Sequence, residues 1–400
     1  MKIGIFTDAY DPLISGVVVS IKTLKKSLEN LGHQVYIVTT NSPHVKKEVD
    51  PYVIRIKGIP LPFKIFKNYR WVLKYKHHLP KIKALNLDVI HIHTEFGLGL
   101  FGIYTKQKLK LPLVYTMHTL YVSFFEINNS FLIKMFRQTM LNYANKIVRR
   151  SLVNANAIIF PTQKVLDFTV KCFHMDANYH ASISSVASII PTGLNLTNFY
   201  KDNLEPNHVN ALKDKLNLQD FFVCLYVGRL SSEKEINYLI DAFAALNRAN
   251  SQTKFLIIGD GPEKKNLIKQ AKKLGISDKV IFLGFIPYEQ LGVYYQLGDV
   301  FINASLFETQ GLTYIEALAA SLPLIVRYDQ VLSDIIKDGQ NGFFYYQKNE
   351  LINKLTQLSY NKAQCQSLSA KALESIKQYN QEVFGQKVLN VYQQVLNGDQ

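Results

Sequence analysis

Short apolar runs alternate with longer amphipathic segments along the first half of the chain. Residues 2–7 form an apolar run, a loop containing Pro12 and Gly16 follows, and residues 17–31 carry apolar positions at helical spacing. Further runs rich in β-branched and aromatic residues occur at residues 33–40, 88–94, 111–119 and 157–162. Strands that alternate with helices predict a parallel sheet covered by helices on both faces.

The same pattern restarts after residue 210. Strands are expected at residues 221–228, 254–259, 279–284, 299–305 and 322–327, with helices between them, among them residues 236–246 and 288–297. Residues 190–210 suit a linker, and the last part of the chain predicts one or two helices with no following strand.

These elements predict an α/β protein with two Rossmann-like, doubly wound domains that face a central cleft. We expect the domains at residues 1–195 and 196–375, followed by a C-terminal helix at residues 376–400. Open α/β sheets bind ligands at the carboxyl ends of their strands. The loops at those ends are therefore where chemistry is expected.

Composition narrows the class of protein. Hydrophobic residues make up 48% of the chain, which is typical of globular domains. Cys172, Cys224 and Cys365 lack metal-ligand spacing and indicate reduced thiols in a cytosolic compartment. The first residues do not resemble a secretory signal, and no apolar run approaches the roughly 20 residues of a membrane span. We expect a protein that is soluble or attached only to a membrane surface.

Positive charge is concentrated in the first half of the chain. Residues 1–200 contain 25 Lys and Arg against 10 Asp and Glu, whereas residues 201–400 contain 21 of each class. The net charge of +15 therefore comes from the first half, and residues 51–87 contain nine basic residues and no acidic one. An acidic partner surface would be met by this half.

Two glutamates flank a predicted helix start in the second half. Glu308 and Glu316 are separated by seven residues, and Thr309-Gln310-Gly311 follows a predicted strand. Free backbone N–H groups at a helix start can hold a phosphate, aided by the helix dipole. Two carboxylates at this spacing suit hydroxyls on either side of a diphosphate, although two ordinary helical glutamates would have the same spacing.

Cations and glycines follow two other strands of this half. Arg229 and Lys234 come after a strand that ends at Gly228, where cations are unfavourable at a helix start unless an anion lies there. Such cations stabilise a departing diphosphate. Gly259 and Gly261 follow the next strand and either approach a ligand or form a plain turn.

The first half offers two candidate residues. Gly16 opens a helix and allows close approach of a phosphate or a sugar, or serves the turn alone. His118 follows a predicted strand at the edge that faces the expected cleft. A single histidine is often structural, but this position favours a functional role.

Taken together, these motifs resemble those of the family 4 retaining glycosyltransferases, over nearly the whole chain. The resemblance rests on Glu308 with Glu316, Gly228-Arg229 with Lys234, the IIGDGP strand end, the IIPTGLN segment and Gly16. It implies the GT-B architecture, with the final helix crossing back onto the first domain. Two positions depart from the family pattern: Ser321-Leu322-Pro323 replaces Gly-x-Pro, and Glu235 replaces a small residue.

The resemblance also implies roles for the candidate residues. Glu308 would contact hydroxyls of the donor sugar, Glu316 the ribose, and Arg229 with Lys234 the diphosphate, while His118 would lie near the sugar. The implied catalytic set is Glu308, His118, Arg229 and Lys234. The implied donor-binding set is Gly16, Arg229, Lys234, Gly259, Gly261, Glu308, Thr309, Gln310, Gly311, Leu312 and Glu316.

Retention of configuration implies an α-glycoside made from an α-nucleotide-sugar by front-side displacement. No acidic metal-binding motif is present in the sequence. We therefore expect no metal site, no tightly bound cofactor and no need for a divalent metal. Within the family, the first loop and the layout of the N-terminal half look most like bacterial diacylglycerol glucosyltransferases. This implies UDP-glucose as donor and diacylglycerol as acceptor.

Basic and aromatic residues of the first half support a lipid acceptor. Residues 63–85 read as a basic, aromatic-bearing segment suited to an interfacial helix, and residues 121–150 hold a second such stretch. The expected membrane-binding residues are Lys64, Lys67, Arg70, Trp71, Lys74, Lys76, Phe124, Phe125, Lys134 and Arg137. We expect peripheral attachment to anionic lipids on the cytoplasmic face of the cell membrane. Ordinary helices with a solvated charged face are the alternative.

Two other readings of the function remain open. The same chemistry can serve another sugar or acceptor: a glycolipid, another lipid, a polysaccharide or a sugar-phosphate. A non-catalytic basic protein that binds membrane or nucleic acid fits the charge distribution, but the sequence has no nucleic-acid module, so we expect no nucleic-acid partner. Loss of activity on replacing Glu308 would separate an enzyme from a binder.

Overall fold

The chain forms two compact units, and each is described by itself. The computed structural model describes residues 1–13, 15–61, 69–118, 131–172, 186–306 and 308–398, without the side chains of residues 131–136 and 172. One unit comprises Met1–Leu194 and Gln381–Gln400, and the other comprises Asn195–Asn380. The boundaries therefore fall after residues 194 and 380, against expected positions after 195 and 375.

The first unit is built on a seven-stranded parallel sheet. Its order is β3-β2-β1-β6-β7-β8-β9, so the strand order reverses between β1 and β6. The strands are β1 (Lys2–Phe6), β2 (Gln34–Thr40), β3 (Val53–Ile56), β6 (Val89–Ile92), β7 (Leu113–Thr116), β8 (Ala157–Phe160) and β9 (Ala187–Ile189). The helices are α1 (Gly16–Asn30), α2 (Leu79–Lys83), α3 (Gly97–Leu109), α5 (Phe131–Asn154), α6 (Gln163–Cys172) and α15 (Gln381–Asn397).

The alternation of side chains along each strand decides which face of the sheet each helix covers. Ile3 and Ile5 of β1 pack in one cluster with α1 and α15, whereas Phe6 contacts Phe101 of α3 at 5.5 Å between ring centroids. Successive side chains of a strand point to opposite faces. The sheet is thus covered by α1 and α15 on one face and by α3 on the other.

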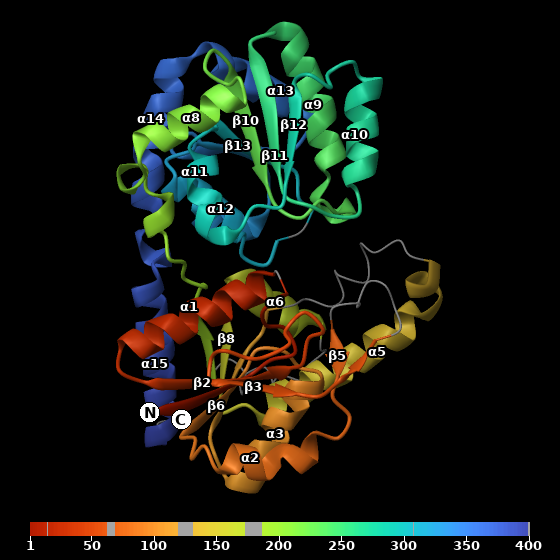
Figure 1. Cartoon of the computed structure of the whole chain (residues 1–400), viewed down its shortest axis with the longest axis vertical. Coiled ribbons are helices and arrows are strands. Elements are labelled where there is room, and N and C mark those ends of the chain that lie inside the picture. Colours follow the sequence, from red (N-terminus) through yellow and green to blue (C-terminus); the bar gives the residue numbers. More distant parts are fainter. Residues whose placement is uncertain (14, 62–68, 119–130, 173–185, 307, 399–400) are drawn as a thin grey trace. The chain divides into compact units, whose positions relative to one another are not determined.

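The C-terminal helix α15 completes the first unit, although it is last in sequence. Phe384, Val388 and Tyr392 of α15 are buried in the same cluster as Leu24 of α1. A Cβ atom on Gly385 would lie 1.9 Å from the hydroxyl oxygen of Ser27. Glycine therefore allows α15 to lie directly against α1 (Figure 1).

The second unit repeats the architecture with six parallel strands in the order β12-β11-β10-β13-β14-β15. The strands are β10 (Phe222–Val227), β11 (Thr253–Ile258), β12 (Val280–Gly284), β13 (Val300–Asn303), β14 (Leu324–Arg327) and β15 (Gly342–Tyr345). The helices include α8 (Pro206–Lys215), α9 (Ile236–Ala249), α10 (Lys264–Lys273), α11 (Leu291–Tyr295), α12 (Leu312–Ala319), α13 (Lys348–Tyr360) and α14 (Lys362–Ala372). Short 3-10 turns include η5 (Ser232–Lys234) and η8 (Leu373–Tyr379).

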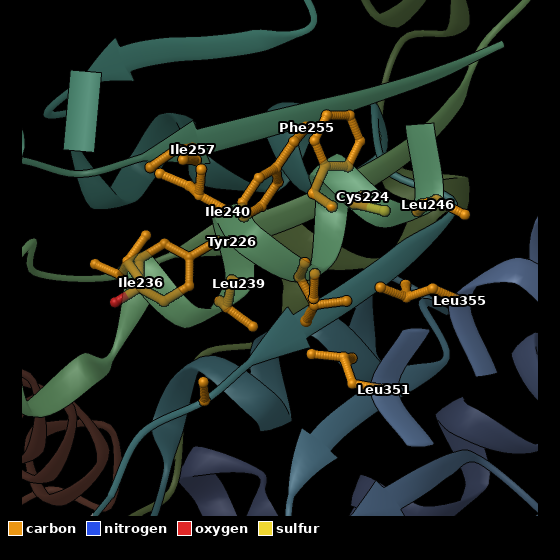
Figure 2. Packing of buried hydrophobic residues seen from close by; sticks show 14 of the residues in the cluster. Cys224, Tyr226, Ile236, Leu239, Ile240, Leu246, Phe255, Ile257, Leu351 and Leu355 are labelled. Carbon is orange, nitrogen blue, oxygen red and sulfur yellow. The ribbon is translucent and has the colours of Figure 1, made fainter. Parts of the chain in front are cut away.

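The core of the second unit lies between its sheet and two of its helices. Cys224 and Phe255 of the central strands are buried against Leu239 of α9 and against Leu351 and Leu355 of α13 (Figure 2). This packing holds the central strands, and with them the loops at their carboxyl ends.

The expected α/β class with two doubly wound sheets is confirmed, and most strands fall where the apolar runs predicted them. In the two large sheets, three short strands, β3, β9 and β15, were not predicted. The expected helix at 288–297 is divided into a 3-10 turn, η6 (Tyr288–Gln290), and α11. The expected polar linker at 190–210 contains the 3-10 turns η3 (Thr197–Phe199) and η4 (Lys201–Asn203) and the start of α8.

The interfacial helix expected over residues 63–85 is wrong for the part of this segment that the structure describes. Residues 70–83 form a two-residue strand, β5 (Arg70–Trp71), then a 3-10 turn, η2 (Tyr75–His78), and then α2. β5 pairs antiparallel with β4 (Ile59–Pro60), which fixes Trp71 in an extended conformation. Pro80 lies in the first turn of α2, so the α-helix cannot extend further toward the N-terminus.

Candidate functional site

An ion pair joins two loops at the carboxyl edge of the second sheet. Lys234, at the end of η5 after β10, lies 2.7 Å from Oε1 of Glu308 in the loop after β13. The same Nζ donates to the hydroxyl of Ser305 at 3.2 Å. Glu308 is only 12% exposed at its side chain. Two residues that the sequence proposed separately are therefore direct partners.

Further contacts fix the carboxylate of Glu308. The hydroxyl of Tyr314, from α12, donates to Oε1 at 3.4 Å. The backbone N–H of Glu308 donates to the carboxylate of Asp329 at 3.3 Å. The N–H of Leu306 donates to the carbonyl of Glu233 at 3.0 Å and closes the two loops on each other. Glu308 is thus held in one place with its charge balanced by Lys234.

Gly311 immediately precedes α12 and has a conformation that favours glycine. Its φ is +82°, and a Cβ atom there would lie 2.7 Å from the ring of Tyr314. Helix α12 begins at the next residue, Leu312, as the sequence predicted. Gln310 is buried, whereas Thr309 and Leu312 are partly exposed. The N–H groups of this helix start lie next to Glu308 in the chain.

Glu316, in α12, is buried and hydrogen-bonded to a tyrosine. It is 4% exposed, and the hydroxyl of Tyr295 donates to its Oε2 at 2.7 Å. Burial raises the pKa of Glu316 to about 7, although the Tyr295 hydrogen bond acts in the opposite direction. The carboxyl therefore titrates near neutral pH.

Gly259 and Gly261, which follow β11, are required by the close approach of the loop after β10. A Cβ atom on Gly259 would lie 1.8 Å from the carbonyl oxygen of Gly228, and one on Gly261 would lie 2.2 Å from that of Leu230. The N–H of Leu230 also donates to the carbonyl of Asp260 at 3.0 Å. These loops pack backbone against backbone, which explains both glycines without a ligand.

Arg229 is the exposed cation of this edge. Its side chain is exposed, and its carbonyl accepts from the hydroxyl of Tyr226 at 3.1 Å. Within the described parts of the chain, its guanidinium has no ion-pair partner. Arg229 can therefore meet an anion, whereas Lys234 already holds Glu308.

In the first unit, Gly16 and His118 lie at the carboxyl ends of β1 and β7. Gly16 is the exposed first residue of α1, and Ser15 caps this helix by accepting from the N–H of Val18 at 3.4 Å. His118 is partly exposed, and its Nε2 lies 2.9 Å from Nδ1 of His93. Burial lowers the pKa of His118 to about 4, so its ring is neutral at neutral pH.

Sequence reasoning missed that His118 belongs to a group of three histidines. The ring of His91 lies 4.1 Å from that of His93 between centroids, and His91 contacts Tyr392 of α15 at 2.6 Å. The signal was available, because His91 and His93 alternate along β6 and must share one face. Its meaning depended on α15, which lies three hundred residues further along the chain.

The expected membrane-binding residues are only partly described. Lys64, Lys67, Phe124 and Phe125 lie outside the described residues, as does the side chain of Lys134. Arg70 and Arg137 are partly buried. Trp71 is 41% exposed and Leu73 is 58% exposed, and Lys74 and Lys76 beside them are exposed. An apolar and basic surface therefore exists at residues 71–76.

Comparisons with known proteins identify the family of this chain. Residues 14–196 match the family model described as Glycosyltransferase Family 4, and residues 209–375 match Glycosyl transferases group 1. The chain is 42% identical over 393 residues to an alpha-monoglucosyldiacylglycerol synthase of Acholeplasma laidlawii, covering 98% of this chain and 96% of that protein. The chain belongs to glycosyltransferase family 4.

A second relative and a solved structure extend the comparison. An alpha-monoglucosyldiacylglycerol synthase of Streptococcus pneumoniae is 37% identical, covering 88% of this chain and 76% of that protein. The crystal structure of Anabaena HepE in complex with UDP has a TM-score of 0.76 at 18% identity and covers 98% of this chain and 100% of that one. At that identity the likeness shows the fold, which is GT-B. The sequence-based assignment to family 4 is thus confirmed.

No described helix is both long enough and apolar enough to cross a bilayer. Among the same residues, no three His, Cys, Asp or Glu side chains are grouped so that they could hold a metal ion.

Proposed function

We propose that this family 4 glycosyltransferase moves glucose from UDP-glucose to 1,2-diacylglycerol and forms alpha-monoglucosyldiacylglycerol. The observation that carries the proposal is the 42% identity, over almost the full length of both chains, to the Acholeplasma laidlawii synthase. The Anabaena HepE structures in complex with UDP and with UDP-glucose, which share the fold, support a UDP-sugar donor.

The second unit supplies the donor site in this proposal. Glu308 binds hydroxyls of the glucose, and Glu316 binds the ribose. Arg229, exposed at the loop after β10, and Lys234 bind the diphosphate. The ammonium group of Lys234 has three donors, and Glu308 and Ser305 take two of them. The third remains for a phosphate oxygen, so one cation links the sugar-binding carboxylate to the leaving group.

The remaining candidates have subsidiary roles in this proposal. Thr309, Gln310, Gly311 and Leu312 line the helix start where backbone N–H groups favour an anion. Gly16 lies at the phosphate and acceptor side, and His118 lies at the sugar. Gly259 and Gly261 hold two loops together through close backbone contact. They therefore shape the site without needing to touch the donor.

The reaction proceeds with retention of configuration at the anomeric carbon. The free hydroxyl oxygen of diacylglycerol forms a bond to C1 of glucose while the bond from C1 to the phosphate oxygen breaks on the same face. The hydroxyl proton passes to an oxygen of the departing UDP. Charge that develops on the diphosphate is stabilised by fixed cations placed before the reaction begins. We propose that Arg229 and Lys234 supply this stabilisation and that no divalent metal is required.

The enzyme acts at the cytoplasmic face of the cell membrane in this proposal. Trp71 and Leu73 enter the interface, and Lys74 and Lys76 meet anionic headgroups. Each basic residue near an anionic bilayer contributes about 1 kcal/mol. This surface supports peripheral attachment beside a lipid acceptor.

The test is a transfer assay with radiolabelled UDP-glucose and mixed micelles of diacylglycerol, with and without an anionic phospholipid. Thin-layer chromatography of the lipid extract should show one labelled lipid that α-glucosidase cleaves. Formation of the lipid should persist in EDTA and increase with anionic lipid.

Two variants test whether activity in this assay depends on the proposed donor site. Glu308→Gln should lose about 100- to 1,000-fold in kcat, whereas exposed Glu374→Gln should behave as the unaltered enzyme. Release of UDP with only a water-soluble acceptor would keep the donor site and discard the lipid acceptor. No turnover with any UDP-sugar would reject the proposal.

A further inference from the structure

Three histidines and two hydroxyl side chains lie on one face of the first sheet, at the ends of β6 and β7. In β6 the register pairs Ile3 of β1 with Val89 and Ile5 with His91. Because Ile3, Ile5 and Val89 all face the cluster of α1 and α15, His91 and His93 face the same way. In β7, Val114 is opposite His91, which places Thr116 and then His118 on this face.

One set of hydrogen bonds surrounds His91, and another joins His93 to His118. Nδ1 of His91 lies 2.6 Å from the hydroxyl of Tyr392, and its Nε2 lies 2.7 Å from that of Thr116. The ring of His93 lies against that of His91 at an interplanar angle of 43°, and its Nδ1 contacts His118. His91 is therefore fixed at both nitrogens, and its ring limits the movement of His93.

The other nitrogen of His93 has no partner among the residues that the structure describes. His93 is 1% exposed, and its Nε2 is buried with no hydrogen bond to any residue that the structure describes. A neutral imidazole has one N–H donor and one acceptor nitrogen. Nε2 of His93 is therefore either a buried N–H group without an acceptor or a buried acceptor nitrogen without a donor.

The two tautomers differ in what they leave unpaired. If His118 donated to His93, the proton of His93 would sit on Nε2 as a buried N–H without an acceptor. If His93 donates from Nδ1 to His118, only an acceptor lone pair is left at Nε2. Orphaned buried N–H groups are rarer in proteins than under-satisfied acceptors, so the second arrangement is favoured. His118 then accepts at Nε2 and carries its own proton on Nδ1.

We propose that His93 is a positioning residue that donates from Nδ1 to Nε2 of His118 and thereby presents the Nδ1–H of His118 as a fixed hydrogen-bond donor. The inference rests on the proposed function, in which His118 lies at the donor sugar. The chemical partner of this N–H is an oxygen of the sugar or of the departing phosphate. An N–H donor suits either oxygen as a hydrogen-bond acceptor, and a phosphate oxygen also gains negative charge as the bond to C1 breaks.

A charged ring does not fit this group. Both nitrogens of His91, and one nitrogen each of His93 and His118, lie against close neighbours within this group. Burial lowers the pKa of His91 to about 3 and that of His118 to about 4, and that of His93 lies well below its ordinary value. All three rings are therefore neutral at neutral pH, and tautomer choice decides what they donate.

The experiment pairs a spectroscopic readout with kinetics. Full-length protein labelled with ¹⁵N at histidine is examined by NMR, with the His118 signals assigned through His118→Asn. We expect Nδ1 of His118 to be protonated and its Nε2 unprotonated in the unaltered protein. In His93→Leu, which has no donor, that preference should be lost. A proton on Nε2 of His118 in the unaltered protein would overturn the inference.

Kinetics then tests whether the tautomer matters. His93→Leu should lower kcat by about 10- to 100-fold, as loss of a residue that orients a functional imidazole does, with little change in KM for UDP-glucose. His93→Asn, whose amide can donate from a similar position, should recover most of that loss. The exposed His44→Leu is the matched control and should have no effect. Equal activity of His93→Leu and the unaltered enzyme would overturn the proposal.

The NMR arm separates this inference from the proposed function. If the unaltered enzyme turns over no UDP-sugar, the proposed function fails, but the protonated nitrogen of His118 still decides whether His93 donates. If transfer occurs and His118 carries its proton on Nε2, the function stands and the positioning role is rejected. Thermal melting of each variant checks that the cluster remains folded.

Discussion

Glu316 is a carboxyl group in a place where water cannot solvate its charge. Its one described partner is the hydroxyl of Tyr295, and burial outweighs that bond and raises the pKa from 4.5 to about 7. The ribose hydroxyls of a donor would supply hydrogen bonds to the charged form, which lowers the pKa of a carboxyl group. In the proposed site, donor binding and ionisation of Glu316 therefore favour each other.

The raised pKa of Glu316 predicts an unusual dependence of stability on pH. Between about pH 4.5 and pH 7 the folded protein keeps a proton that the unfolded chain has released, so this group makes the free energy of unfolding fall as pH rises. Glu316→Gln removes the effect. The stability of the variant relative to the unaltered protein should increase by up to roughly 3 kcal/mol across this window.

Urea unfolding of both proteins at several pH values from 4.5 to 8 measures this difference. A constant difference across the series would contradict the raised pKa. Glu374→Gln, at an exposed position, is the control and should follow the unaltered protein at every pH.

Glu235 replaces a small residue of the family pattern, and its backbone conformation is expected to affect stability. It has φ of +49° in the left-handed region, immediately before α9, and non-glycine residues there are strained by roughly 1–2 kcal/mol. Glu235→Gly should remove that strain at the smaller cost of glycine's extra flexibility in the unfolded chain. We expect the free energy of unfolding to rise by up to about 1 kcal/mol.

The matched control for Glu235→Gly is Glu263→Gly, because Glu263 precedes α10 with φ of −81° and has no such strain. That variant should be less stable by about 0.5–1 kcal/mol. Urea denaturation of the two variants should therefore give changes of opposite sign. Destabilisation by both would show that the side chain of Glu235 outweighs its backbone strain.

At the scale of elements, the sequence predicted most strands but not the contacts that the folded sheets create. The alternation of apolar and polar residues predicted most strands of both sheets and the start of α12 beside Glu308. It did not predict β3, β9 or β15, which lie at the edges of the sheets and are only partly buried, so that their apolar runs are less complete. Nor could it pair Lys234 with Glu308 or His93 with His118, because those contacts join positions that only the folded sheet brings together.

Tyr392 gives a direct test of what α15 contributes to the first unit. Its hydroxyl contacts Nδ1 of the buried His91, so Tyr392→Phe leaves that nitrogen unsatisfied at a cost of about 1–3 kcal/mol in the free energy of unfolding. Tyr346→Phe, at a residue that is 65% exposed, is the control. Chemical denaturation compares the two. Equal stability would mean that α15 is held by its apolar packing alone.

At the scale of the whole molecule, net charge indicates which half meets an acidic surface, whereas the fold decides the shape of that contact. Both halves of the sequence form the same kind of parallel sheet, yet the excess of +15 belongs to residues 1–200. Composition could therefore predict which half meets an acidic surface, because net charge does not depend on local structure. It could not predict the shape of the contact, since the expected interfacial helix is replaced in its described part by β5, η2 and α2.

The surface at residues 71–76 carries its own reporter of membrane contact, because Trp71 is the only tryptophan of the chain. Its fluorescence should shift to shorter wavelength on addition of vesicles that contain anionic lipid, and the shift should weaken with salt, which screens exposed charges. The double change Lys74→Gln and Lys76→Gln removes about 2 kcal/mol of attraction at about 1 kcal/mol for each residue. The vesicle affinity should then fall by about 30-fold.

The matched control is the double change Lys272→Gln and Lys273→Gln, at two exposed lysines of the second unit. It should leave the affinity unchanged. Equal losses from both pairs would mean that total charge, and not this surface, holds the protein at the membrane.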